Sequence, residues 1–375
     1  MIRGSDSLAS DLTWLGALRT PALVLKWPLQ EWERVIRLAR RLRLLARLAD
    51  GVSTCGLIEQ VPPQPRRHLL AELRLSHWRS ASLTWTLRQV SAAIQPANYP
   101  CVLLKGAAYM AQGLPIAGGR LPSDLDILVP RSALPFAQDL LAAAGWRTVD
   151  MDEHDRLYYE EWSHEVPPMR HPRLGLELDL HHNILPPVGG NPIDAAALLG
   201  RLQPSKWQPW QVLHPVDQVL HCAAHLFLDS ELRDRLRDLV DLDGLFRHFG
   251  ADVQFWPSLV ERAGELGLAE PLALACHFCV RWLDTPVPDA TQLAVKKLGP
   301  GWVRRAWLLP VFDHVLTPTA PDDAPGCIAD AAALVVLARY HRHRLPLNLL
   351  VPHLWHKIRA GGRSDARSEP AGAGP

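Results

Sequence analysis

The segment GGRLPSDLDILV, residues 118–129, sets two acidic side chains into an apolar run. Its centre holds Asp124 and Asp126, separated by Leu125 and followed at once by Ile-Leu-Val. A short apolar run between Gly-Pro punctuation and Pro130 predicts a β-strand. Side chains alternate along a strand, so both carboxylates should point the same way while Leu125 points into the core. Two neighbouring acids repel each other, and a divalent cation is the commonest way to hold them together.

A second acidic strand is predicted at residues 174–181, LGLELDLH. Its leucines at 176, 178 and 180 fall on one face, and Glu177, Asp179 and His181 fall on the other. This strict alternation is the clearest periodicity in the chain, and it indicates a half-buried strand with its acids on one side.

A strand followed by a glycine turn precedes both acidic strands. Residues 101–104 form a short apolar run, and Lys105-Gly106-Ala107-Ala108 leads into a predicted helix. Glycine lets backbone amides approach phosphates closely, and the helix N-terminus favours their charge. Nucleotidyl transfer requires such a turn, carboxylates that bind two metal ions, and a further carboxylate that can receive the hydroxyl proton.

The motifs LLKGAA, GGRLPSDLDILV and LELDLHHNI together resemble a family of uncharacterised bacterial nucleotidyltransferases in the DNA polymerase β superfamily. The resemblance extends over roughly residues 30–345, including the HEVPPMRHP segment ahead of LELDLHH. It implies an α+β fold, in which a small mixed β-sheet forms the nucleotidyltransferase core. We accordingly expect an N-terminal helical cap over residues 1–96, the catalytic core over 97–203, a C-terminal helical domain over 204–358 and a disordered tail over 359–375.

Carried over residue by residue, the resemblance makes Asp124 and Asp126 the metal-binding pair and Asp179 the third carboxylate. Glu177 lies on the same face of its strand and is the alternative to Asp179. The implied metal is Mg²⁺ or Mn²⁺, and the implied substrate is a nucleoside triphosphate, with ATP expected. Residues assigned to nucleotide binding are Lys105, Gly106, Ala107, Arg120 and Ser123. Among them, Arg120 is expected to contact phosphate, since a guanidinium suits bidentate recognition of its oxygens.

The resemblance implies transfer of a nucleoside monophosphate to an acceptor hydroxyl on a small molecule, a protein or an RNA end. The sequence departs from the superfamily at Gly106-Ala107, where a Gly-Ser or Gly-Gly pair usually contacts phosphate. This departure motivates an alternative hypothesis: a catalytically weak nucleotide-binding module that acts through a protein partner, as a toxin–antitoxin component or a biosynthetic accessory. A zinc hydrolase built on His181, His182 and His221 is a third hypothesis, because imidazole suits zinc.

Composition restricts the partners. The 375 residues carry 40 basic and 39 acidic side chains, so the protein has no large net charge that would attract nucleic acid or membrane surfaces. A nucleic-acid acceptor is possible but not favoured. Six cysteines in so long a chain do not indicate a disulfide framework, and the N-terminus lacks a signal-peptide core. With no apolar run of about 20 residues, we expect a cytoplasmic protein without a membrane span.

The remaining sequence is mostly helical in pattern. A helix is predicted from Leu29 to Ala49, stopped by Asp50-Gly51, and a second one from about Arg67 to Ile94. After Pro204 the predicted helices cover 214–228, 231–249, 256–266, 271–283 and 328–344. His221 and His225 have ligand spacing on a helix, but a structural role is favoured for them because the H-E-x-x-H glutamate is missing. Cys276 and Cys279 are interpreted as buried thiols.

Overall fold

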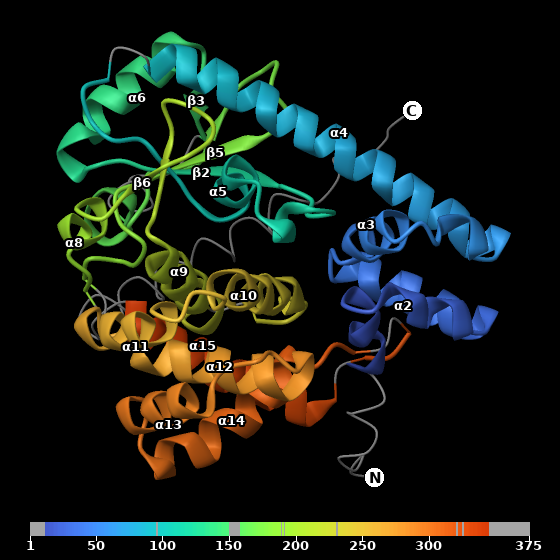
Figure 1. Ribbon diagram of the computed structural model, residues 1–375. Helices are drawn as coiled ribbons and strands as arrows, with labels where there is room; N and C mark the ends of the chain where they lie inside the picture. Colours follow the sequence, from blue (N-terminus) through green and yellow to red (C-terminus); the bar gives the residue numbers. More distant parts are fainter. Residues whose placement is uncertain are drawn as a thin grey trace, which may run out of the picture.

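The computed structural model describes residues 12–94, 97–149, 158–188, 190, 192–229, 232–319, 322–324 and 326–344 (Figure 1). The predicted tail, 359–375, lies outside these ranges. The helices are η1 (Thr13–Leu18), η2 (Pro21–Lys26), α2 (Leu29–Arg41), α3 (Leu45–Thr54), η3 (Ile58–Gln60), α4 (Pro63–Ile94), α5 (Lys105–Gln112), η4 (Pro115–Ala117), η5 (Arg131–Ala133), α6 (Leu134–Ala143), η6 (Tyr158–Trp162), α8 (Ala195–Leu199), α9 (Pro215–Phe227), α10 (Leu236–Phe249), α11 (Phe255–Glu265), α12 (Ala269–Leu283), α13 (Asp289–Leu298), α14 (Trp302–Leu316) and α15 (Cys327–Arg344). The strands are β1 (Val102–Leu103), β2 (Asp124–Leu128), β3 (Arg147–Thr148), β4 (Met169–Arg170), β5 (Glu177–His181), β6 (Gln203–Pro204) and β7 (Gln211–Val212).

The strands form one mixed sheet in the order β3-β4-β5-β2-β1-β7-β6. The two acidic strands β2 and β5 are parallel neighbours at its centre, whereas β1 pairs with β2 in the antiparallel direction. The α+β fold with a small mixed sheet and flanking helices is therefore confirmed.

The alternation read from the sequence sets the faces of the two central strands. Leu125 and Leu178 are fully buried, and Ile127 and Leu180 are almost so. These four side chains share one face, because residues two apart on a strand point the same way and the two strands pair in register. The acids therefore share the opposite face.

The helical segment near the N-terminus differs from the prediction. The expected helix over 29–49 is two helices, α2 and α3, because Arg43 adopts a left-handed conformation with φ 56° between them. The expected stop at Asp50-Gly51 was wrong, since α3 continues to Thr54. A glycine inside a helix costs only about 1 kcal/mol. Burial of apolar side chains such as Leu48 and Val52 offsets that cost.

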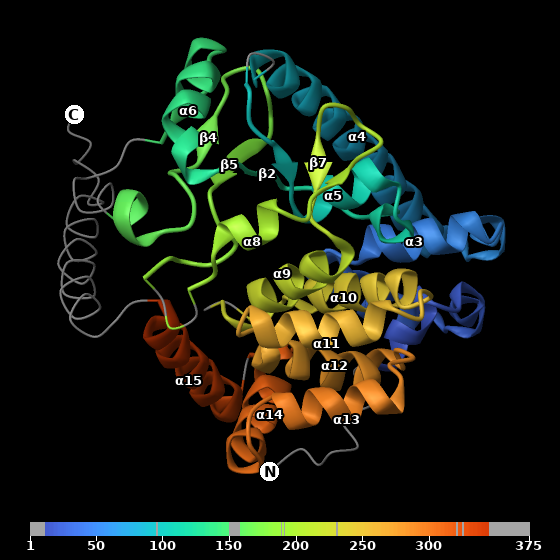
Figure 2. The same ribbon diagram turned by 60° about the vertical axis from the view of Figure 1, so that its left-hand side comes forward.

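The helices surround the sheet on two sides. Helices α4 and α6 lie above it in both views, and α8, α9 and α10 lie below it, followed by the layer of α11 to α14 (Figures 1 and 2). Buried apolar residues from all of these regions join in one hydrophobic cluster. Among the described residues, no helix combines the length and apolar character needed to cross a membrane.

Candidate active site

The predicted acidic face is built by the register of β2 and β5. Asp124 stands opposite Glu177, and Asp126 stands opposite Asp179. Neighbouring strands lie roughly 4.8 Å apart, so the carboxylates of Asp126 and Asp179 start from adjacent backbone positions on the same face. The backbone register therefore sets these acids side by side on one face of the sheet, as the sequence predicted.

Asp126 is the most buried of these acids, with 3% of its surface exposed. Its Oδ1 accepts a hydrogen bond from Nζ of Lys105 at 2.9 Å and another from Nε2 of His181 at 3.0 Å. A carboxylate can only accept here, so Nε2 of His181 carries the proton. His181 shares a face of β5 with Asp179, but its hydrogen bond is to Asp126 on β2.

The charges of this trio support one another. Although burial alone would raise it, Lys105 and His181 hold the pKa of Asp126 well below its ordinary value. Burial opposes the charge of Lys105 as well, yet Asp126 and Asp124 raise its pKa. Burial opposes the charge of His181 too, but the hydrogen bond to Asp126 and the charges of Glu165 and Asp126 together raise its pKa. The Asp126 carboxylate is therefore held in position between two donors.

Asp179 carries the uncompensated charge of the site. Burial raises the pKa of its carboxyl to about 7, and repulsion from Asp126, Glu165 and Asp124 adds to the shift. A group in this state gains from a nearby cation, since a positive charge would restore its ionised form. Oδ2 of Asp126 accepts no hydrogen bond from the described residues, so it is available to a cation. The carboxylate oxygens of Asp124, Asp126 and Asp179 nevertheless do not all lie within 4.8 Å of one another.

Glu177, the alternative third carboxylate, is occupied elsewhere. Its Oε2 accepts a hydrogen bond from Nε of Arg170 on β4 at 2.9 Å and forms an ion pair with Nη2 of the same residue at 2.8 Å. Ser123, which precedes the first acid, donates from its hydroxyl to Oδ1 of Asp124 at 3.2 Å. These contacts favour Asp179 over Glu177, and the third-carboxylate role stays a prediction.

Arg120 and Gly106 meet at the start of α5. The guanidinium of Arg120 is buried, donates from Nε to Asp241 at 2.9 Å and lies over the ring of Tyr109. A Cβ added to Gly106 would come within 2.0 Å of Nη1 of Arg120. Glycine is thus needed at 106 for close approach of this guanidinium. The predicted phosphate contact of Arg120 stays a prediction, because its described partner is a carboxylate.

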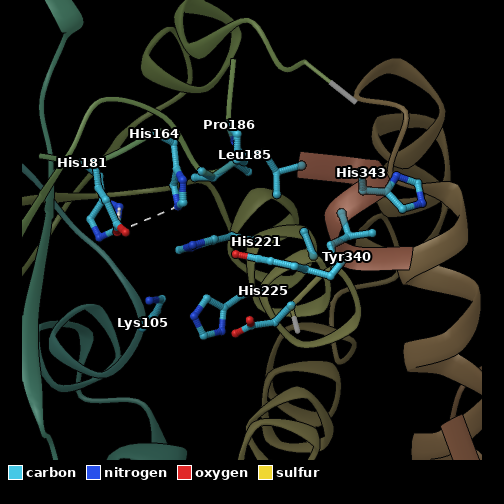
Figure 3. A pocket seen from close by; sticks show the side chains of 14 residues that line it. Lys105, His164, His181, Leu185, Pro186, His221, His225, Tyr340 and His343 are labelled. Atoms are coloured by element: carbon cyan, nitrogen blue, oxygen red, sulfur yellow. Dashed lines mark ion pairs between the residues drawn. The ribbon is translucent and has the colours of Figure 1, made fainter. Parts of the chain in front are cut away.

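A cavity of about 160 Å³ opens beside the acidic face (Figure 3). Lys105 from α5, His181 from β5, His221 from α9 and Tyr340 from α15 all face this space. Burial, with help from Lys105 and His181, lowers the pKa of His221 to about 3, so its imidazole is neutral. A cavity of similar volume can hold a ligand the size of benzene. The cavity therefore has room for one small ring or side chain.

Comparison with known families identifies the chain. A family model described as uncharacterised nucleotidyltransferase matches residues 28–284, more than half of the sequence. The chain belongs to this nucleotidyltransferase family. Comparisons with curated proteins and with solved structures found no match.

Family membership gives the chain a general function, transfer of a nucleotidyl group. The nucleotidyltransferase also has residues at its site that the motifs did not single out. His164 and Glu165 line the cavity from the segment ahead of β4, and Nδ1 of His181 lies 3.3 Å from Oε2 of Glu165. Sequence reasoning missed them because residues 150–173 lack a periodic pattern. The adjacent His-Glu pair was the available signal.

The histidines of the zinc-hydrolase hypothesis do not converge in this nucleotidyltransferase. His182 is turned away from His181, and its Nε2 lies 3.1 Å from the carbonyl oxygen of Ser163. Adjacent residues on a strand face opposite ways, so this outcome follows from the backbone. The buried-thiol interpretation of Cys276 and Cys279 is confirmed, since both are buried and free.

Proposed function

We propose that the protein transfers a nucleoside monophosphate from a nucleoside triphosphate, with ATP expected, to an acceptor hydroxyl. The observation that carries this proposal is the parallel register of β2 and β5, which sets Asp124, Asp126 and Asp179 on one face. Beside that face, β1 and the turn at Gly106 lead into α5. In this reaction an acceptor oxygen bonds to the α-phosphorus and pyrophosphate leaves.

The three aspartates would hold Mg²⁺ or Mn²⁺. A bound divalent ion supplies charge neutralisation for the triphosphate and for the leaving pyrophosphate. Asp179 is suited to a further task, because a carboxyl with a pKa of about 7 can take up the hydroxyl proton near neutral pH.

Lys105 and the turn that follows it would bind the phosphates. Lys105 is the first residue of α5 and has a positive φ of 45°. Its ammonium faces both Asp126 and the cavity, so it can neutralise the carboxylate now and a phosphate oxygen once nucleotide is present. The amides at Gly106 and Ala107 open α5, where an anion is favoured.

The acceptor would enter through the cavity. Its wall combines neutral imidazole rings with apolar side chains, including Ile184, Leu185 and Leu228. Such a lining favours a compact acceptor group over a highly charged polymer, and the balanced net charge of the chain agrees with that.

The test is a transfer assay with Mg²⁺ and each of the four nucleoside triphosphates labelled at the α-phosphate. Release of pyrophosphate, or label on the protein or on an added metabolite mixture, is the expected result. Asp124→Asn combined with Asp179→Asn should abolish it. If wild-type protein binds nucleotide yet releases no pyrophosphate with any of the four, the transferase proposal is wrong.

That outcome would support a second candidate, a nucleotide-binding module with weak catalysis that acts through a protein partner. Two observations favour it. The turn reads Gly106-Ala107 without the hydroxyl common in the superfamily, and Asp126 is already neutralised by Lys105 and His181.

A further inference from the structure

We infer that His164, Glu165 and His181 form a binding site for a single transition-metal ion of the zinc class, separate from the aspartates. Within the described part of the chain, they are the only group of three or more metal-capable side chains whose ligand atoms all lie within 4.8 Å of one another. Two imidazoles and one carboxylate are the ligand set of many catalytic zinc sites.

The backbone holds these three residues together. Glu165 forms an isolated antiparallel bridge with His181, and the amide of His182 donates to the carbonyl of His164 at 2.8 Å. Val166 extends the pairing through its amide, which donates to Leu180 at 2.9 Å. The ligands are therefore presented by paired strands, and the site needs little reorganisation to bind an ion.

The distances suit a metal ion. Nδ1 of His181 and Oε2 of Glu165 are 3.3 Å apart, and Nε2 of His164 lies 4.0 Å from the same oxygen. Bonds of about 2.0–2.2 Å in a tetrahedral site place two ligand atoms roughly 3.3–3.5 Å apart. The first pair already has this separation, and the second needs to close by only a fraction of an ångström.

His181 shows the strongest sign of a missing ligand. Its Nε2 donates to Asp126, which leaves Nδ1 facing Glu165. Nδ1 is buried, and its contact with Glu165 lacks the geometry of a hydrogen bond. A cation between the two atoms would satisfy both. The arrangement also repeats the carboxylate–histidine–metal relay, in which an outer carboxylate orients the ligating ring.

The fourth position would face the cavity. His164 and His181 face it (Figure 3), and Glu165 is also in its lining, so a bound ion could take a water molecule or an acceptor atom from that side. Imidazole ligands favour zinc, cobalt and nickel over magnesium, which prefers oxygen. The site should therefore stay selective for the transition metal when Mg²⁺ is in excess.

Titration of the chelator-stripped protein with Co²⁺, in millimolar Mg²⁺ and without nucleotide, tests this inference. Visible absorption bands of bound Co²⁺ should saturate at one ion per chain, and Zn²⁺ should displace them. His164→Ala and Glu165→Gln should each weaken binding by roughly 100-fold or more, since loss of even an outer partner costs about 10–100-fold. His171→Ala, a histidine outside the cavity, is the matched control and should bind normally.

Circular dichroism and thermal melting of the metal-free variants establish that each is folded. Absence of saturable Co²⁺ binding by the wild type would overturn the inference. So would binding that is unchanged in His164→Ala and Glu165→Gln but lost in Asp124→Asn, because the ion would then occupy the aspartates. Co²⁺ absorption is measured without a transfer assay, so its result does not depend on whether the proposed reaction occurs.

Discussion

Oδ2 of Asp241 accepts a hydrogen bond from Nε of Arg120 at 2.9 Å, while its Oδ1 lies 3.0 Å from Nη2 of Arg47. One carboxylate on α10 thereby joins a half-buried guanidinium from α3 and a buried one from the loop that leads into β2. This side chain therefore links α3, that loop and α10.

Asp241→Asn should strongly destabilise the fold, because it leaves the buried guanidinium of Arg120 and the half-buried one of Arg47 without their shared carboxylate. Breaking a buried ion pair from one side costs about 3–5 kcal/mol. Urea denaturation followed by tryptophan fluorescence measures the change. The control is Asp322→Asn, which removes the partner of Arg37 in an exposed pair and should leave stability almost unchanged. Equal losses in the two variants would contradict the structural role of Asp241.

Gly106→Ala should displace Arg120 and damage the nucleotide turn. The new methyl would lie 2.0 Å from Nη1, and relief of such a clash costs roughly 1–3 kcal/mol in a packed region. We expect lower thermal stability and weaker nucleotide binding, measured by calorimetry. Gly175→Ala is the control, since a Cβ there meets nothing within 4 Å. A Gly106→Ala protein with wild-type stability and affinity would show that the turn does not need glycine.

Asp179→Asn should stabilise the metal-free protein in a pH-dependent way. The carboxyl has a pKa of about 7 in the folded protein and about 3.9 when unfolded. Between these values the folded state binds more protons, so wild-type stability falls as pH rises from about 4 to about 7. The amide has no such dependence.

The advantage of the Asn variant should therefore grow over that window and stay constant above pH 7. Melting temperatures from pH 4 to 9, with chelator present, measure it. Saturating Mg²⁺ at pH 8 should reverse the advantage, because the ion stabilises only the carboxylate form. A difference between the two proteins that does not change with pH would mean that Asp179 is not the titrating group.

Asp124→Asn should reduce pyrophosphate release by about 10²-fold or more, because an amide holds a divalent cation poorly. Glu177→Gln should retain most activity, since Glu177 is bound by Arg170 at the side of the site. Initial rates at saturating nucleotide and Mg²⁺ measure both. If Glu177→Gln loses as much activity as Asp179→Asn, then Glu177 is the third carboxylate.

The parts of the fold that follow from local pattern could be predicted. Apolar and polar residues alternate in LGLELDLH because one face of β5 is buried, and the sequence alone shows this alternation. The break between α2 and α3 could not be predicted, because nothing in the sequence marks Arg43 as left-handed. Helices α13 and α14 and the two-residue strands β6 and β7 were also missed. Their patterns are short or weak, and tertiary packing decides them.

The candidate site could likewise be predicted only in part from the sequence. Asp124, Asp126 and Asp179 lie on strands whose periodicity assigns their faces. Their mutual register, however, depends on how β2 and β5 pair in space. The partners of Arg120 and His181 come from residues 121 and 55 positions away along the chain. Such long-range contacts leave no local pattern, so the pairing of Arg120 with Asp241 and of His181 with Asp126 became visible only in the folded structure.

Helix α9 is enclosed on nearly all sides, with eleven of its thirteen residues buried, and lies between the sheet and helices α11 and α12 (Figure 2). It also supplies His221 and His225 to the cavity wall. A fragment cut after β7 would keep every recognised motif but lose this helix, exposing the apolar surface that it covers. The smallest piece that can be expressed, or grafted into another enzyme, must therefore extend through the C-terminal helices. Under the proposed function, substitutions at His221 or His225 would alter acceptor preference while leaving Asp124, Asp126 and Asp179 intact.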